Sequence, residues 1–164
     1  MQSKEILSGW QRKVHILHRC NALLAAKYDI SGKVLGLSST ILSVIVTTSI
    51  FTALTQSENT IVIIVTGILS MITAIFSAAY QYLKLPDLTS RYHQAVSSYG
   101  NLRREIEITL SETEGNKISE DVLKHISKEW TDLDKKAPPI PNKLYQKVEE
   151  KIKNEELSNS KKKN

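Results

Sequence analysis

Two long runs without a charged residue constrain this 164-residue chain more than any other feature. The first extends from Val34 to Leu54, and the second from Ile61 to Leu83. Helices of about 21 and 23 residues, rising about 1.5 Å per residue, are about 32 to 35 Å long. A bilayer's hydrocarbon core is about 30 Å thick. The sequence therefore predicts two transmembrane helices, spans 34–54 and 61–83, rather than a soluble core.

A cleaved signal peptide is the main alternative for the first run. Many polar and charged residues precede Val34, and the run exceeds the usual apolar region of about 7 to 15 residues. A second run follows after the short loop 55–60. We therefore expect a signal anchor that stays in the protein as the first arm of a hairpin.

The basic residues indicate how this hairpin is oriented. The loop 55–60 contains no Lys or Arg, so all 22 basic residues lie outside it. Lys27 and Lys33 precede the first span, while Lys84 and Arg91 follow the second. Cytoplasmic flanks of membrane helices carry an excess of Lys and Arg. We therefore expect an integral, multi-pass membrane protein with both termini in the cytoplasm.

The net charge of +5 suits contact with anionic lipid. Nucleic-acid binding is not expected, because no basic patch interleaved with aromatic residues and no binding motif is present. No Gly-rich phosphate loop, serine elbow or Cys-x-x-Cys motif appears, so we expect neither an enzyme nor a cofactor.

Each of three side chains before the first span has a functional and a purely structural interpretation. His15 and His18 form a candidate metal pair, but no third ligand is near, so packing or surface positions are expected. Cys20 is the single cysteine, and we expect a buried thiol rather than a disulfide or a palmitoylated residue.

Small and hydroxyl-bearing residues recur on each span at spacings of three and four, which place each set on one helix face. The sets are Gly36, Thr40, Ser43 and Thr47, with Thr48 as a further hydroxyl, on the first span, and Thr66, Ser70, Thr73 and Ser77 on the second. One interpretation is close helix packing with hydroxyl bonds between helices. The other is the lining of a water-filled pore, which requires several hairpins. The absence of charged residues within the spans excludes an intramembrane proton relay.

The segments outside the hairpin are predicted to be helical and cytoplasmic. An apolar stripe from Ile6 to Tyr28 follows a helical period, with basic residues between its members. The predicted fold is an all-α membrane protein, a two-helix transmembrane hairpin with cytoplasmic amphipathic helices before and after it. Its parts are the N-terminal amphipathic helix 1–32, the hairpin 33–83, the C-terminal cytoplasmic helices 84–136, and a Pro-containing segment with a charged tail, 137–164.

A heptad-spaced seam follows the break expected at Pro86. Its members, at spacings of four and three, are Leu88, Tyr92, Ala95, Tyr99, Leu102 and Ile106. About three heptads are short for a coiled coil between chains. Packing against the N-terminal helix of the same chain and an oligomer-forming coiled coil both remain open.

The C-terminal part has its own helix signals. A turn is expected at Glu114-Gly115-Asn116, and Ser119 is a predicted N-cap with carboxylates in the first turn. The apolar stripe of this helix is expected to be Val122, Ile126, Trp130 and Leu133. Prolines within 138–141 end it, and a weak, mostly charged helix from Lys143 to Glu156 precedes a disordered tail.

The order of these parts resembles the SLATT family, the SMODS and SLOG associating two-transmembrane effector domain. The resemblance covers about residues 10–150, and its most specific part is Ala137-Pro138-Pro139-Ile140-Pro141 after Trp130. It implies an effector of conflict or immune systems that forms membrane pores, controlled by a nucleotide-second-messenger synthase or sensor. This chain carries no fused sensor, so that partner is expected to be a separate protein.

The leading hypothesis is therefore a homo-oligomeric pore in the lipid bilayer, with the first span as its lining. The alternative from another class is a non-conducting membrane scaffold or adaptor, which presents its cytoplasmic helices to a partner protein. A compact holin-like lysis protein is disfavoured by the long segment after the second span.

Overall fold

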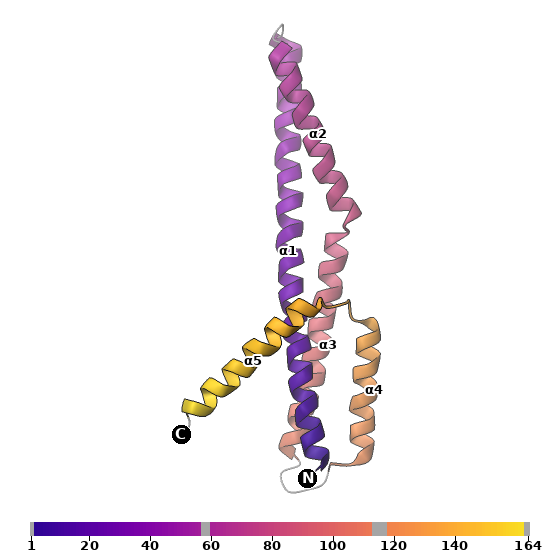
Figure 1. Ribbon diagram of the computed structural model, residues 1–164. Coiled ribbons are helices and arrows are strands. Elements are labelled where there is room, and N and C mark those ends of the chain that lie inside the picture. Colours follow the sequence, from indigo (N-terminus) through magenta and orange to yellow (C-terminus); the bar gives the residue numbers. More distant parts are fainter. Residues whose placement is uncertain (1, 57–59, 113–117, 163–164) are drawn as a thin grey trace. The chain divides into compact units, whose positions relative to one another are not determined.

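The chain is all-helical over the residues that the computed structural model describes, 2–56, 60–112 and 118–162 (Figure 1). Its helices are α1 (Gln2–Gln56), α2 (Thr60–Tyr82), α3 (Leu85–Glu112), α4 (Glu120–Lys136) and α5 (Asn142–Lys162). The predicted N-terminal helix and first span form one continuous helix, α1. The expected turn at Glu114-Gly115-Asn116 lies outside the described residues.

The helices form two compact units, each with its own packing. The helical unit combines residues 1–25, the start of α1, with residues 90–164. The hairpin unit contains residues 26–89, the rest of α1 and all of α2.

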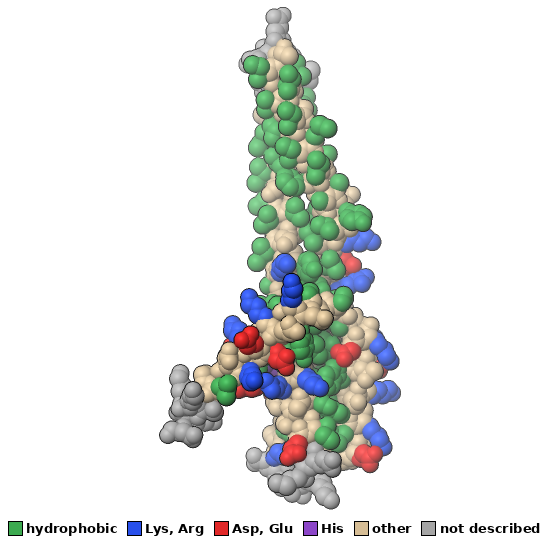
Figure 2. Space-filling model, viewed as in Figure 1, with side chains coloured by type: hydrophobic (Ala, Val, Ile, Leu, Met, Phe, Trp, Pro, Cys, Tyr) green, Lys and Arg blue, Asp and Glu red, His purple; other side chains and the backbone are tan. Residues whose placement is uncertain are grey.

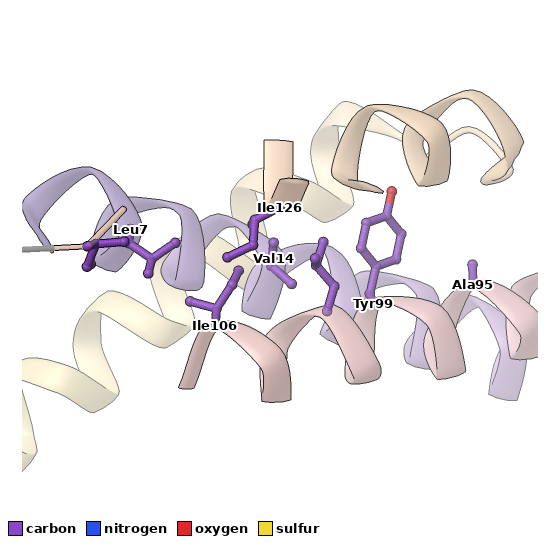
Figure 3. Packing of buried hydrophobic residues seen from close by; sticks show 8 residues of the cluster. Leu7, Val14, Ala95, Tyr99, Ile106 and Ile126 are labelled. Carbon is purple, nitrogen blue, oxygen red and sulfur yellow. The ribbon is translucent and has the colours of Figure 1, made fainter. Parts of the chain in front are cut away.

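The core of the helical unit is built from three helices. Leu7 and Val14 of α1 meet Ile106 of α3 and Ile126 of α4, and all four side chains are buried (Figure 3). Trp10 and Trp130 meet edge to face at the rim, with ring centroids 6.0 Å apart. Burying one aliphatic side chain such as Leu, Val or Ile contributes about 1.5 to 3 kcal/mol. The cluster of four buried aliphatic residues therefore dominates the packing of the unit.

Both ends of α4 follow from local chemistry. The Ser119 side chain accepts a hydrogen bond from the backbone N–H of Asp121, which confirms the predicted N-cap. At the other end, the Ala137 N–H donates to the carbonyl of Leu133 at 2.8 Å. The expected stripe needs one correction, because Val122 is exposed and Leu123 packs on the core instead.

The last helix is a second correction. We expected a weak helix ending near Glu156 and then a disordered tail, but α5 continues to Lys162. Val148 and Ile152 bury their side chains against Ile16 and Cys20 of α1. These two residues lie one turn apart and face the same side of α5, where Leu144 and Tyr145 pack beside them. Cys20 is fully buried, as predicted, and this burial raises its pKa to about 11.

The hairpin unit has the opposite character. Figure 2 shows hydrophobic side chains over the visible face of its two helices. By length and composition two helices, within Ser3–Phe51 and Ile63–Glu112, are apolar enough to cross a membrane. Only 0% and 6% of their apolar stretches are buried inside the chain. A soluble protein buries such helices, so these surfaces suit contact with lipid.

The α2–α3 junction explains how the chain leaves the hairpin. Lys84 adopts a left-handed conformation with φ of 44°, and the following helix has Pro86 in its first turn. A proline there is favourable, since its missing N–H has no helical partner at that position. The break expected at Pro86 is therefore made by Lys84.

Candidate functional site in the hairpin

The hydroxyl set of α2 lies on the side that packs within the hairpin unit. Thr66 is buried, and Ser70, Thr73 and Ser77 are half-buried. Ser70 and Thr73 donate to carbonyls four residues earlier at 2.9 and 2.8 Å. The hydroxyl oxygens of Ser77 and Ser39 lie 2.6 Å apart, which joins the two helices directly. This face matches the packing surfaces of small residues that hold membrane helices together.

The set on α1 lies differently. Gly36 packs in the hairpin, where an added Cβ would meet the Tyr80 ring at 3.5 Å. Thr40, Ser43 and Thr47 are exposed, and so is Thr48. The structure therefore separates the predicted α1 set into one packing residue, Gly36, and an exposed stripe. We call Thr40, Ser43 and Thr47 the hydroxyl stripe.

Each hydroxyl of the stripe donates within its own helix. The acceptors lie four residues earlier, the carbonyls of Gly36, Ser39 and Ser43, at 3.0, 2.9 and 2.8 Å. Thr48 does the same to Val44 at 2.9 Å. These bonds satisfy the hydroxyl protons, while a hydroxyl oxygen has two acceptor positions. Placing such a surface beside lipid costs little free energy, and its oxygens can also accept hydrogen bonds from water.

Ser39 is the packing residue that sequence reasoning did not select. It lies seven residues from both Gly32 and Val46, a register that marks one helix face. All three residues are half-buried. The stronger hydroxyl pattern one position along the helix, at Thr40, concealed this signal.

In the helical unit, the heptad seam is occupied by contacts within the chain. Tyr92, Ala95, Tyr99, Leu102 and Ile106 are buried. Four of these belong to the core shared with α1 and α4, all except Tyr92. Leu88, in the hairpin unit, is half-buried. A coiled coil between chains through the same side chains would compete with this packing.

The proline segment is fixed by hydrogen bonds and apolar contacts. Tyr92 donates from its hydroxyl to the Pro139 carbonyl at 3.0 Å. Tyr99 donates to Asp134 at 2.5 Å, and Trp130 donates to the same carboxylate oxygen at 3.2 Å. Burial, followed by this contact with Asp134, raises the pKa of Tyr99 above its ordinary value. Ile140 then packs beside α5 on the α1 surface.

A polar network joins α1 to α3 on another side of the helical unit. Arg103 lies 2.7 Å from His15 Nδ1 and donates to Glu107 at 2.7 Å. Because a guanidinium only donates, His15 Nδ1 is the acceptor and its imidazole is neutral. Burial first, then the Arg103 charge, lower the pKa of both His15 and His18. These residues therefore form packing and hydrogen-bonding contacts between helices.

Comparison with known families decides the classification. A family model described as SMODS and SLOG-associating 2TM effector domain family 4 matches residues 6–163. The chain belongs to this SLATT family. Neither the curated proteins nor the solved structures gave a match. Membership in this family and the two exposed apolar helices support an integral membrane protein, and the family description indicates a membrane effector.

Proposed function

We propose that this SLATT protein is a membrane effector whose hairpins assemble into a pore that permeabilises the membrane in a conflict response. The observation that carries the proposal is the hydroxyl stripe. Three hydroxyl side chains, Thr40, Ser43 and Thr47, are exposed on the charge-free span of α1, although the hydroxyl set of α2 packs inward. The helix thus has one polar surface that packing within the hairpin leaves available.

Assembly of several chains is part of the proposal. Two helices cannot enclose a lumen, so hairpins would have to pack side by side with their α1 stripes facing inward. The many exposed apolar side chains, among them Leu37, Ile68 and Met71, would then face lipid or neighbouring hairpins. A lumen with hydroxyls and no charge at its centre would discriminate weakly between anions and cations, and selectivity would arise near Lys33 and Lys84.

Control by a separate protein completes the proposal. The family is described as associating with SMODS and SLOG proteins. We infer a separate nucleotide-second-messenger synthase or nucleotide sensor as the partner, acting on the cytoplasmic helical unit. Both termini would lie in the cytoplasm, in agreement with the basic residues that flank the spans.

A vesicle-release experiment tests the pore. The purified full chain is reconstituted into vesicles with an entrapped dye, and oligomers are verified by cross-linking. We expect release that increases steeply with the protein-to-lipid ratio. No release at any ratio, with oligomers present, would contradict the pore.

A triple variant, Thr40→Val, Ser43→Ala and Thr47→Val, tests the lining. It removes the hydroxyls with little change in shape, so assembly should persist while release falls by about tenfold or more, since water loses its partners in the lumen. Ser8→Ala, Ser111→Ala and Thr131→Val form the matched control. Their exposed hydroxyls also donate into their own helix, but lie in the helical unit. Equal release by the stripe variant and the control would remove the stripe from the lining.

A further inference from the structure

A cluster of three potential metal ligands lies in the helical unit, apart from the surfaces described so far. Glu105 extends from α3, and His125 and Glu129 come from α4, one turn apart. One ligand atom from each residue lies within 4.8 Å of the others. His125 Nε2 is 3.6 Å from Glu105 Oε1 and 3.9 Å from Glu129 Oε1.

These distances suit an ion between the side chains better than direct hydrogen bonds. A nitrogen–oxygen hydrogen bond is about 2.7 to 3.2 Å long, and both separations exceed this range. Ligand atoms about 2.0 to 2.2 Å from a tetrahedral zinc ion lie about 3.3 Å apart. Small rotations of exposed side chains would bring the three atoms to that spacing.

The position of the two carboxylates supports the same interpretation. Glu105 of α3 and Glu129 of α4 lie on either side of the His125 imidazole, so the cluster gathers two carboxylates and one nitrogen donor from two helices. A divalent cation between the three side chains would neutralise the negative charge that two carboxylates bring together there. Imidazole with two carboxylates is a donor set for Zn²⁺ and similar transition metals, whereas Ca²⁺ prefers six to eight oxygens.

We propose that Glu105, His125 and Glu129 bind a divalent transition-metal ion of the Zn²⁺ class, which links α3 to α4. Water would complete the coordination, because these side chains are partly exposed. The ion would tie α4 to α3 next to the contacts that Ile126 and Trp130 already make with the core. This inference is independent of the pore.

The test measures zinc binding by the full chain in detergent micelles. The protein is treated with a chelator, dialysed and titrated with Zn²⁺ against a chromophoric competitor, with Co²⁺ absorption as a second probe. We expect one ion per chain and a weakening of about tenfold or more in His125→Ala, Glu129→Gln and Glu105→Gln, each of which removes one ligand. Zn²⁺ should also raise the unfolding temperature of the unsubstituted chain more than that of His125→Ala.

Matched controls change the same residue types outside the cluster. His93→Ala alters an exposed histidine of α3, and Glu120→Gln alters a carboxylate of α4 that pairs with Lys124. Both should bind zinc like the unsubstituted chain. The proposal is overturned if no saturable binding occurs below about 1 mM, or if binding persists in His125→Ala and disappears in His15→Ala with His18→Ala.

Discussion

His15 and His18 show how a residue-level interaction sets a pH dependence. Their folded pKa values lie below the ordinary 6.5, because burial and Arg103 disfavour the charged imidazole. Below pH about 6.5 the unfolded chain therefore binds more protons than the folded chain. The contribution of the two neutral imidazoles to the stability of the fold is complete above about pH 6.5. It is lost as the pH falls toward the lowered pKa values that the two histidines have in the folded chain.

We therefore expect the helical unit to lose stability between pH 7.5 and 5, by an amount that His15→Gln with His18→Gln reduces. Unfolding at several pH values in micelles measures this slope. Glu107 does not obscure the result. Its pKa is lowered from 4.5, chiefly by a hydrogen bond from Arg103, so its contribution is lost only below that pH. An unchanged slope in the double variant would show that other groups control the acid sensitivity.

The role of a single residue could be predicted from the sequence where its cause is local. Ser119 caps α4 because its hydroxyl reaches a backbone N–H two residues away, a bond that spacing alone predicts. Whether Val122 or Leu123 packs on the core depends instead on where α1 and α3 lie around α4. The same holds for Ser39, whose partner Ser77 is 38 residues away. Such contacts depend on the angle between packed helices, which the sequence of one helix does not specify.

At the scale of elements, the α2–α3 junction holds one non-glycine residue in a strained backbone conformation. Lys84 has φ of 44°, a region where a Cβ costs about 1 to 2 kcal/mol and where glycine is usual after a helix. We expect Lys84→Gly to be more stable than Lys84→Ala by about 1 kcal/mol, since both remove the charge and only glycine removes the strain. Unfolding with a denaturing detergent, followed by circular dichroism, compares them. Equal stability would mean that the junction relaxes without cost.

The docking of α5 is a second prediction at this scale. Arg19 and Glu155 form an ion pair at 2.7 Å, but both side chains are partly exposed, so solvent screening leaves this pair only a small contribution to stability. Ile152→Ala should cost more, about 2 kcal/mol or more, because it leaves a cavity beside Cys20. Limited proteolysis should then cut α5 faster. Ile108→Ala, at an exposed position of α3, is the matched control and should change neither quantity.

This docking also shows where sequence reasoning stops. The two long apolar helices were predictable because lipid imposes length and apolarity on a single helix, with no partner needed. The seam from Tyr92 to Ile106 was visible as a pattern, but the sequence left its partner open between the N-terminal helix and a second chain, and the structure provides Leu7 and Val14 of the N-terminal helix. Val148 and Ile152 resemble isolated apolar residues in a charged helix until Ile16 and Cys20 are brought beside them.

At the scale of the whole molecule, the helical unit is built from segments on both sides of the hairpin, and this limits how the chain can cross a membrane. Residues 1–25, before the hairpin, and residues 90–164, after it, pack in one core. Both flanks must therefore lie on the same side of any membrane that the hairpin crosses. The positive-inside bias predicts that this side is the cytoplasm.

Cysteine labelling tests this arrangement in the full chain with Cys20→Ser as background. Single substitutions Ser8→Cys in α1 and Ser127→Cys in α4 place exposed thiols on the two flanks, and Thr60→Cys places one at the start of α2. In sealed cells, an impermeant reagent should label Thr60→Cys from outside, and the other two only after permeabilisation, since a charged reagent does not cross the hydrocarbon core. Labelling of all three from outside would contradict a membrane-spanning hairpin. Labelling of Ser8→Cys and Ser127→Cys from opposite sides would show instead that the two flanks do not share a core in the membrane, and the packing of α1 on α3 would have to form in another state of the protein.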